Sequence, residues 1–470
     1  MPRLVVIGGG ISGLAAAWAA RESAQRAGQG LEVIVLERGD EVGGKARSIV
    51  RDGWLVEGGP SGFLGGRPEM ARLVRGAGMA GELVLARQSA KRRFLYRAGA
   101  MREIVGSPAG FAKSGILSAR GMARLVAEPF IPRRRDRTTD ETVWEFAARR
   151  LGAEVADRLV APMSLGIFAG DAHRLSLASA FPKMADLERD HRSLILGLLA
   201  KGGRTSAGPL TSLRGGMQSL PLALAERGGF TVHCKSAVSA VERTADGWSV
   251  SVAGSSQRID ADGIVLATEP WVTATLLGPL HERAASALAG IPCPPVAVVA
   301  LGFGPEVRAQ VPDGFGVLIA RGEGFRMLGN LWETSLYPDR GPEGGILIRA
   351  MLGGAVDAAI GDLTDDEVLA CARVEVRRLY GLGAEPRFTA VVRIPRAIPQ
   401  YECGHRERVT VVETALHDLP GLAVTGFGLR GVAFADAASD GVRTGEQMAS
   451  WIGARPVQTL NLASGPLQTP

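Results

Sequence analysis

A glycine-rich turn close to the N-terminus constrains the fold of this chain more than any other feature of its sequence. Residues 3–7 are mostly apolar and predict a buried strand, and an alanine-rich stretch at 14–27 predicts a helix. Residues 31–37 predict a second strand, which ends in Glu37. The glycines lie between the first strand and the helix. This order predicts a βαβ unit and therefore an α/β fold with a parallel sheet.

The spacing of these glycines, with Gly8, Gly10 and Gly13 in a Gly-x-Gly-x-x-Gly pattern, is typical of a turn that binds the pyrophosphate of a dinucleotide. Gly8 allows a sharp turn, Gly10 lets the pyrophosphate approach the backbone, and Gly13 lets the helix pack closely on the strand. The free N–H groups and the positive end of the helix dipole favour an anion there. Glu37 follows Gly13 by 24 residues and is expected to accept hydrogen bonds from a ribose. The other residues of the turn expected at the dinucleotide are Gly9, Ile11 and Ser12. The alternative is a glycine-rich turn in an unrelated α/β fold.

The segment after Glu37 distinguishes between the common dinucleotides. Gly43 and Gly44 form a doublet followed by basic residues, which resembles the extension of the amine-oxidase-like flavoproteins; nicotinamide-dependent dehydrogenases generally lack it. An ordinary surface turn is the alternative. The resemblance implies FAD as the cofactor, with the doublet along its pyrophosphate and ribityl chain. Further residues that we expect at this cofactor are Arg38, Lys45, Gly59, Pro60, Ser61 and Gly62, together with Val238 against the adenine half.

A second strand–glycine–helix arrangement lies near the C-terminus. Residues 422–425 predict a short strand, a glycine-rich stretch follows at 426–431, and residues 435–451 predict a helix. The positive end of that helix would stabilise negative charge on a reduced flavin. A plain C-terminal αβ unit is the alternative. The residues expected at the flavin here are Gly426, Phe427, Val432, Ala433 and Phe434.

Composition limits the other classes of function. The chain has 470 residues and a formal net charge of +6, which fits nucleic acid, an anionic membrane or an acidic small molecule as partner. The densest basic cluster is Arg133, Arg134, Arg135 and Arg137. It has no interleaved aromatic residues, so we expect a solvated loop and no nucleic-acid partner, with contact to phosphate or lipid headgroups as the alternative. The four cysteines and six histidines are scattered, which predicts no metal site and a reducing compartment.

Further motifs, in order along the chain, resemble the oxygen-dependent protoporphyrinogen oxidases, a family of the same flavoprotein superfamily. They lie at residues 91–96 (KRRFLY), 166–171 (GIFAGD), 314–318 (GFGVL), 351–354 (MLGG), 398–401 (IPQY) and 404–405 (GH). One stretch departs from the family, which often has an Asn-Asp-Cys-like sequence where this chain has residues 433–436 (AFAD). Only backbone contacts to the flavin are therefore carried over to that stretch.

The resemblance assigns residues to a porphyrinogen substrate. Arg93 aligns with an arginine that pairs with a substrate propionate, a role for which its two parallel donors are suited. The macrocycle would lie against Gly166, Ile167 and Phe168. Its pyrrole rings would be sandwiched by Phe315, Leu318 and Met351. The alternatives are structural: Arg93 would belong to a solvated loop, and the other residues to a tight turn or to core strands.

The implied reaction is the oxidation of protoporphyrinogen IX to protoporphyrin IX in haem biosynthesis. A methylene bridge would transfer a hydride to flavin N5, and three rounds of reoxidation by O2, each giving H2O2, would complete the conversion. The alternatives are oxidation of coproporphyrinogen III to coproporphyrin III, a flavin amine oxidase or carotenoid desaturase, and a non-catalytic prenyl-binding relative. No side chain is assigned as a catalytic base, and Asp171 is expected to cap a loop.

The motifs divide the chain into three expected domains. Residues 1–90, 205–280 and 386–470 would form a discontinuous, Rossmann-like FAD-binding domain, residues 281–385 a mixed-sheet substrate domain, and residues 91–204 a helical domain. Apart from the N-terminal strand, turn and helix, no apolar run reaches the roughly 18 residues of a membrane span, so we expect a cytoplasmic protein. The apolar run at 194–199 predicts a buried helix, with peripheral contact to the cytoplasmic membrane face as the alternative. The family resemblance is also compatible with a homodimer.

Overall fold

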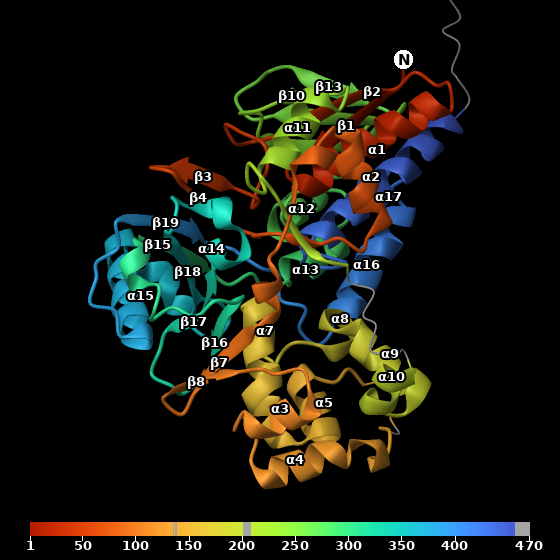
Figure 1. Ribbon diagram of the computed structural model, residues 1–470. Coiled ribbons are helices and arrows are strands. Elements are labelled where there is room, and N and C mark those ends of the chain that lie inside the picture. Colours follow the sequence, from red (N-terminus) through yellow and green to blue (C-terminus); the bar gives the residue numbers. More distant parts are fainter. Residues whose placement is uncertain (135, 137–138, 201–207, 456–470) are drawn as a thin grey trace, which may run out of the picture.

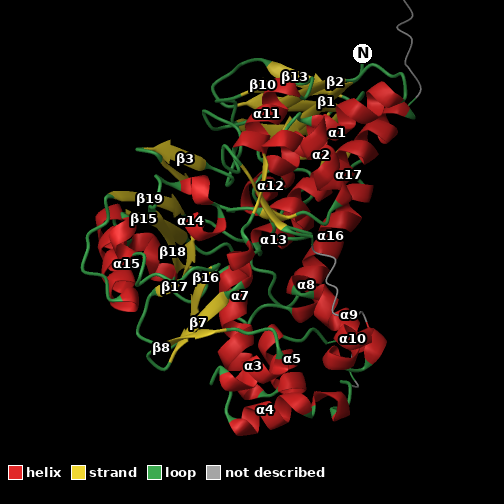
Figure 2. Ribbon diagram, viewed as in Figure 1, coloured by secondary structure: helices red, strands yellow, loops and turns green. Residues whose placement is uncertain are grey.

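A computed structural model of the protein describes residues 1–134, 136, 139–200 and 208–455. Figure 1 shows a parallel sheet with its helices near the N-terminus, a second sheet beside it, and a helical segment below both. The expected α/β fold with a Rossmann-like domain, a mixed sheet and a helical part is confirmed (Figure 2). Arg135 and Arg137 of the basic cluster, and residues 201–207 and 456–470 at the ends of expected domain segments, lie outside the described residues.

The parallel sheet carries the N-terminal βαβ unit. Its strands lie in the order β10 (Thr231–His233), β2 (Glu32–Leu36), β1 (Arg3–Ile7), β14 (Gly263–Leu266) and β20 (Leu422–Val424). All four pairs are parallel, as is typical of strands joined by crossover connections. The sheet therefore brings the ends of strands from distant parts of the chain to one edge. A small antiparallel sheet of β11 (Val238–Arg243), β12 (Trp248–Val252) and β13 (Arg258–Ala261) belongs to the same domain.

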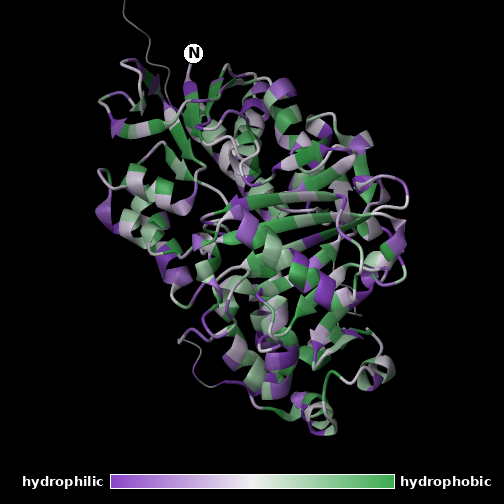
Figure 3. Ribbon diagram, turned by 90° about the vertical axis from the view of Figure 1, so that its left-hand side faces the viewer, coloured by the Kyte–Doolittle hydropathy of each residue, from purple (hydrophilic) through white to green (hydrophobic). Residues whose placement is uncertain are grey.

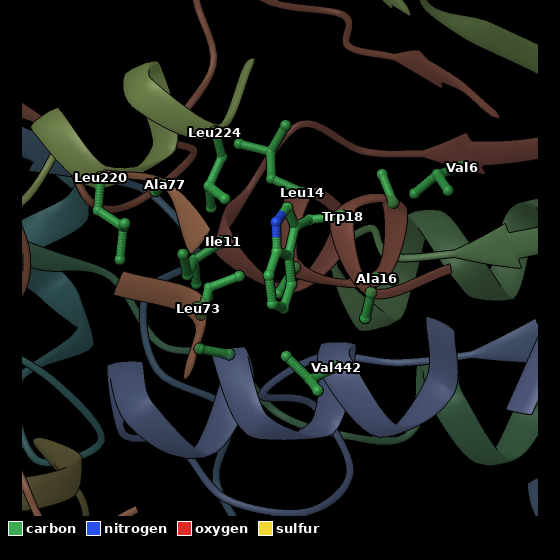
Figure 4. Packing of buried hydrophobic residues seen from close by; sticks show 14 of the residues in the cluster. Val6, Ile11, Leu14, Ala16, Trp18, Leu73, Ala77, Leu220, Leu224 and Val442 are labelled. Atoms are coloured by element: carbon green, nitrogen blue, oxygen red, sulfur yellow. The ribbon is translucent and has the colours of Figure 1, made fainter. Parts of the chain in front are cut away.

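Alternate residues of β1 face two hydrophobic layers. Leu4 and Val6 pack with the helices α1 (Ile11–Arg26), α2 (Pro68–Gly76), α11 (Ser219–Arg227) and α17 (Phe434–Gly453). Val5 and Ile7 pack with α12 (Pro270–Leu277), α13 (Glu282–Ala289) and α16 (His405–His417). Figure 4 shows α17 beneath the core residues of α1. The two helices can approach because Gly441 and Gly445 lack side chains: a Cβ there would lie 2.2 Å from Ser12 O and 2.1 Å from Ala16 O.

The second sheet is mixed. Its order is β19 (Phe388–Ile394), β15 (Val296–Phe303), β18 (Ile346–Gly353), β17 (Met327–Trp332), β16 (Gly316–Ile319), β7 (Arg93–Arg97) and β8 (Ala100–Glu103), with only β16 and β7 parallel. α15 (Asp365–Tyr380) packs on one face of this sheet. The strands form a hydrophobic band through the middle of the molecule in Figure 3. The sheet is therefore half-covered by its own helix and offers its other face to the rest of the protein.

The strand pairings move the expected domain boundaries. β7 and β8 lie within residues 91–204, which we expected to be helical, and β19 lies within the segment expected in the FAD-binding domain. All three belong to the mixed sheet, so the helical part begins only after Glu103. Local sequence patterns predicted no strand in these segments, and β7 and β19 pair with strands that lie far from them along the chain.

The helical segment follows β8. Its elements are α3 (Pro108–Lys113), α4 (Ala119–Val126), α5 (Val143–Leu151), α6 (Ala153–Val155), the π-helix η4 (Ala156–Val160), α7 (Ala161–Phe168), α8 (Leu177–Ala180), α9 (Pro182–His191) and α10 (Leu194–Ala200). α7 lies against the mixed sheet, where it contacts β16 and β17. The helical segment thereby closes one side of the space beneath that sheet.

Short elements connect the two sheets. They are the hairpin β3 (Ser48–Arg51) and β4 (Trp54–Glu57), the strands β5 (Phe63–Leu64), β9 (Leu210–Leu213) and β6 (Leu83–Leu85), and α14 (Glu333–Leu336). Trp54 of β4 packs with Phe388, Ala300 and Leu347 of the mixed sheet. This contact fixes the segment before Gly58 against the mixed sheet.

The apolar run at 194–199 is only partly buried. Leu194 is buried, whereas Leu196, Leu198 and Leu199 are 48%, 42% and 71% exposed. The expectation of a buried helix is therefore wrong for half of this run, because the segment is a surface helix that packs mainly on α9 and the turn after α4. Among the described residues, every helix is too short or too polar to cross a bilayer.

Candidate functional site

A cavity of about 1150 Å³ runs from the parallel sheet to the mixed sheet. It is larger than the roughly 300–1,000 Å³ that a single small ligand usually occupies, so it has room for two molecules side by side. One end is lined by the glycine-rich turns at the N- and C-termini, and the other by the mixed sheet and α7. We describe these as the dinucleotide end and the substrate end.

The N-terminal turn has the geometry of a pyrophosphate cradle. Gly8 has a φ of +111°, and a Cβ there would lie 2.7 Å from Ala267 O. A Cβ on Gly13 would lie 1.9 Å from Gly8 O, whereas nothing lies within 4 Å of a Cβ on Gly10, which lines the cavity. α1 begins directly after Gly10, and no described side chain caps it. The sharp turn at Gly8, the close packing at Gly13 and the open position at Gly10 are the features that dinucleotide binding requires.

Glu37 lies beside this cradle at the end of β2. Its two carboxylate oxygens accept hydrogen bonds from the N–H groups of Gly9 and Gly39, each at 2.7 Å. A Cβ on Gly9 would lie 2.9 Å from the Glu37 Cβ, so Gly9 faces the acid and supports the turn without lining the cavity. Glu37 and Arg38 both line the cavity and could hold a ribose. Val238 lines the same end from β11.

The glycine doublet packs on the cradle. Gly43 donates a hydrogen bond to Gly9 O at 2.9 Å, and both Gly43 and Gly44 have positive φ angles, of +120° and +57°. A Cβ on Gly44 would lie 3.4 Å from the Gly10 Cα. Both residues line the cavity next to Gly10. The doublet therefore extends the backbone surface of the cradle along the cavity, where it can contact the parts of a dinucleotide beyond the pyrophosphate.

Lys45 carries a buried charge at the junction of the two ends. Its Nζ lies 2.9 Å from Glu269 Oε2, donates to Ala397 O at 2.6 Å, and lies 4.2 Å from the Phe427 ring centroid. Burial lowers the pKa of the Lys45 ammonium and raises the pKa of the Glu269 carboxyl, while their mutual attraction opposes both shifts. Sequence analysis found Lys45 but missed Glu269, which follows β14 in a segment without a motif.

Residues 59–62 form a loop held by a buried arginine. Gly59, Pro60 and Gly62 line the cavity, but Ser61 turns away from it. Arg349 of β18 donates to Gly59 O at 2.6 Å and to Ser61 Oγ at 2.6 Å, and its Nε lies 2.7 Å from Glu333 Oε1. Arg349 and Glu333 are both almost fully buried. This pair connects the loop of the dinucleotide end to the mixed sheet.

The C-terminal turn completes the dinucleotide end. Gly426, Phe427, Val432, Ala433 and Phe434 all line the cavity, and α17 begins at Phe434 with no described side-chain cap. Tyr401 organises this turn: its hydroxyl donates to Phe427 O and accepts a hydrogen bond from Gly431 N at 2.8 Å. His405 stacks on Tyr401 and contacts Leu429 O at 3.1 Å. The IPQY and GH motifs indicated these residues without a role, and their role here is to position the turn.

The substrate end is an apolar slot between the mixed sheet and α7. Phe315, Leu318 and Met351 line it from the sheet, and Gly166 and Ile167 line it from α7. A Cβ on Gly166 would lie 2.7 Å from Leu318 Cδ2, so the helix contacts the sheet there. Arg93 of β7 is exposed at the edge of the slot, with its Cζ 5.0 Å from the Phe315 ring centroid. The slot can hold a flat apolar ring system beside a cationic group.

Two of the assigned residues do not face this slot. Phe168 is buried and packs with Phe181 and Tyr401, because successive residues of α7 point in different directions and Phe168 lies on a side of the helix that does not line the cavity. Its side chain therefore does not face the slot, and its expected contact with the macrocycle stays a prediction. Asp171 accepts a hydrogen bond from His173 N at 3.0 Å, which is the expected loop cap, and it does not line the cavity.

Comparison with known proteins identifies the family. The model of the family described as flavin containing amine oxidoreductase matches residues 11–449. The coproporphyrinogen III oxidase of Bacillus subtilis is 31% identical, over 93% of this chain and 96% of its own length. That of Propionibacterium freudenreichii is 32% identical, over 95% and 90%. The chloroplastic protoporphyrinogen oxidase 1 of Spinacia oleracea is 31% identical, over 88% and 78%.

Solved structures show the same fold. A crystal structure from an Exiguobacterium species superposes with a TM-score of 0.82 at 22% identity, over 96% of this chain and 99% of that one. The cyclohexylamine oxidase of Brevibacterium oxydans gives a TM-score of 0.68 at 16% identity, over 96% and 98%. The predicted resemblance, the FAD cofactor and the oxidoreductase class are confirmed by the family match and the curated relatives together. The chain belongs to the flavin containing amine oxidoreductase family.

Proposed function

We propose that this chain is a porphyrinogen oxidase of haem biosynthesis, which uses FAD to oxidise a porphyrinogen to the corresponding porphyrin. The observation that carries the proposal is one continuous cavity in which a glycine-lined dinucleotide end meets an apolar slot with Arg93 at its edge. The names of the curated relatives support the same class of substrate. An amine oxidase has no need for an arginine that binds a carboxylate beside the slot, and a non-catalytic relative has no need for the cradle.

The dinucleotide end could hold FAD mainly through contacts from the protein backbone. The amides of the first turn of α1 would bind the pyrophosphate, Glu37 would accept from the ribose, and the start of α17 would lie near the ring. When bound, FAD would accept hydride equivalents from the porphyrinogen and pass them to O2, and three such oxidations make a porphyrin. The protein's own part is to align the macrocycle between Leu318 and Ile167 and to exclude water from it.

Protoporphyrinogen IX is the substrate that the sequence motifs imply, and coproporphyrinogen III is the second candidate. The latter is favoured by two relatives of that activity, which cover 93% and 95% of this chain. Both substrates present propionates to Arg93. The experiment is to purify the protein, record the flavin absorbance, and follow porphyrin fluorescence after adding each porphyrinogen. A protein that binds FAD but oxidises neither, while oxidising amines, would overturn the proposal.

Arg93 and its neighbour Arg92 provide a matched pair of variants. Arg93 lines the cavity, whereas Arg92 points to the other side of β7, where it lies 2.9 Å from Glu103 Oε2. We expect Arg93→Ala to raise the apparent KM for porphyrinogen about tenfold, because a charge-assisted bond to a carboxylate is lost, and to leave the FAD content unchanged. Arg92→Ala should leave the KM unchanged. Equal effects of the two variants would remove Arg93 from the substrate site.

We also propose a peripheral membrane contact through the helical segment. Val126, Phe130 and Leu199 are 68%, 87% and 71% exposed, and α10 lies against the turn that contains Phe130. Arg133 and Arg134 follow in sequence and could meet anionic headgroups. Co-sedimentation with anionic vesicles, compared for the wild type and Phe130→Ser, tests this proposal. Binding that is equal for both proteins would contradict it.

A further inference from the structure

A second arginine lies at the substrate end, on the opposite wall from the strand that carries Arg93. Arg158 belongs to the π-helix η4, directly before α7, and it lines the cavity together with Leu159, Pro162 and Met163. Short π-helices are rare and often occur at functional sites, because the extra residue redirects a side chain. The sequence motifs gave no indication of Arg158, since it lies in a helical stretch without a recognisable pattern.

Arg158 lies beside a third arginine, Arg97 of β7. Arg97 is four residues beyond Arg93, so the two side chains share a face of the strand. Their Cα atoms are about 13 Å apart, at roughly 3.3 Å per residue. Leu95 lies between them on that face and lines the slot. Arg97 is half-buried, and burial together with the nearby Arg158 lowers its pKa. Arg93 and Arg158 line the cavity, whereas Arg97 does not line it and acts on that end of the slot through its charge beside Arg158.

The two arginines at this second position differ in their partners. Arg158 pairs with Glu154, which is one turn away, and donates to Ile116 O at 2.9 Å. Glu154 also accepts hydrogen bonds from the N–H and the hydroxyl of Ser118. Among the described residues Arg97 forms no salt bridge, and Glu323 and Asp157 act on it only at longer range. Arg97 therefore has no direct carboxylate partner, and an anion bound at Arg158 would be attracted by both guanidinium groups.

We infer that Arg158, with Arg97 beside it, forms a second carboxylate-binding position at the far end of the slot from Arg93. This inference rests on the proposed porphyrinogen oxidation. A substrate that bears propionates on opposite edges can use both positions, and coproporphyrinogen III bears one on every pyrrole ring. Protoporphyrinogen IX bears its two propionates on neighbouring rings, so it can use only one position at a time. The arrangement selects the substrate with four carboxylates.

The experiment compares wild type, Arg158→Met and Arg158→Lys as FAD-loaded enzymes on both porphyrinogens. We expect Arg158→Met to lower kcat/KM for coproporphyrinogen III about tenfold more than for protoporphyrinogen IX, mainly through KM. Arg158→Lys keeps the charge and should recover most of the preference. An equal loss on both substrates, with a lower Tm, would show that Arg158 only supports the helix and would overturn the inference.

A binding measurement separates this inference from the proposed function. Quenching of porphyrin fluorescence by the FAD-loaded protein reports binding of coproporphyrin III without turnover. We expect a Kd about tenfold higher for Arg158→Met than for wild type. An unchanged Kd overturns the second position even if the enzyme oxidises porphyrinogens. A raised Kd in a protein that oxidises neither porphyrinogen keeps the binding position and removes the proposed reaction.

Discussion

The two ends of the cavity are built from different parts of the chain. At the dinucleotide end, the contact surface is mainly backbone, supplied by turns at Gly8–Gly13, Gly43–Gly44 and Gly426–Gly431 that are each continuous in sequence. At the substrate end, the surface consists of side chains from β7, α7, β16 and β18. The first end depends on positions where no side chain is tolerated, and the second on which side chains are present.

This difference determines how each end responds to change. A Cβ at Gly8 or Gly13 of the cradle meets a backbone carbonyl, which cannot move without shifting a strand or a helix. A Cβ at Gly166 of the substrate end meets the tip of the Leu318 side chain, which can change rotamer. The cofactor site should therefore be fixed while the substrate preference can vary through a few side chains, which fits relatives that carry two different porphyrinogen names.

The largest effect is expected from Gly13→Ala. The new Cβ would lie 1.9 Å from Gly8 O, so α1 must move away from β1. We expect a loss of unfolding free energy above about 3 kcal/mol and no retained flavin, because the cradle would open. Thermal unfolding and flavin absorbance of the purified protein measure both effects.

Gly10→Ala is the matched control for the cradle. Nothing lies within 4 Å of its Cβ, and its φ of −73° is allowed for alanine, so the apoprotein should keep its Tm. The methyl group would point into the cavity and weaken FAD binding. If Gly10→Ala lowered Tm as much as Gly13→Ala, the distinction between packing and contact roles in this turn would be wrong.

The next effect concerns the junction between the two ends, at Arg349. Arg349→Met should cost about 3 kcal/mol of unfolding free energy, because it leaves the buried Glu333 without its cationic partner and two carbonyl groups without this donor. Chemical denaturation measures this cost. Adding Glu333→Gln should recover part of the loss, since no buried charge then remains unpaired. The single variant Glu333→Gln is measured as well. If the double variant loses as much unfolding free energy as the two single variants lose together, the two residues do not interact.

The dinucleotide end was largely predictable from the sequence. Gly8, Gly10, Gly13, Gly43 and Gly44 lie in short motifs whose physical requirements are local, and the structure places four of them on the cavity wall and Gly13 at the helix contact. The order of strand, turn and helix was equally visible, since hydrophobic periodicity is a local property. The sequence could not show that Ser61 faces Arg349 and not the cavity, because that depends on a contact across nearly 300 residues.

The substrate end was predictable only through family motifs. Arg93, Phe315, Leu318 and Met351 are at the cavity, but Phe168 is not, because its direction depends on how α7 rotates against the sheet. Arg158 and Glu333 had no motif at all. The same limit affected the domain boundaries, since β7 pairs with β16 across more than 200 residues. Such pairings are tertiary properties, which a local pattern does not encode.

Gly166→Ala tests the tolerance of the substrate end with the same substitution as Gly13→Ala. The new Cβ would lie 2.7 Å from Leu318 Cδ2, which is the flexible end of a side chain. We expect a loss of about 1 kcal/mol of unfolding free energy and full FAD content, but a higher KM for porphyrinogen because the slot narrows. A loss as large as that of Gly13→Ala would show that both ends are equally rigid.

The smallest effect is expected at His405, which supports the C-terminal turn of the dinucleotide end. Burial lowers the pKa of His405 below its usual value of 6.5, so the unfolded chain binds more protons than the folded protein as pH falls below 6.5. Stability should therefore decrease on acidification from pH 6.5 towards the lower folded pKa, with a slope of at most about 1.4 kcal/mol per pH unit.

Two variants of α16 isolate this titration. His405→Gln should flatten the slope of unfolding free energy between pH 6.5 and 5, since its amide can still donate to Leu429 O but does not titrate there. His417→Gln, at the exposed end of the same helix, should keep the slope.

Release of FAD gives a second measurement. His405 and Tyr401 together position the turn at Gly426–Gly431. If FAD release follows the same pH dependence in wild type but not in His405→Gln, the dinucleotide end depends on side chains as well as on its backbone. A slope that is identical in all three proteins would mean that other groups, such as the nearby Asp140 and Glu407, control the acid response.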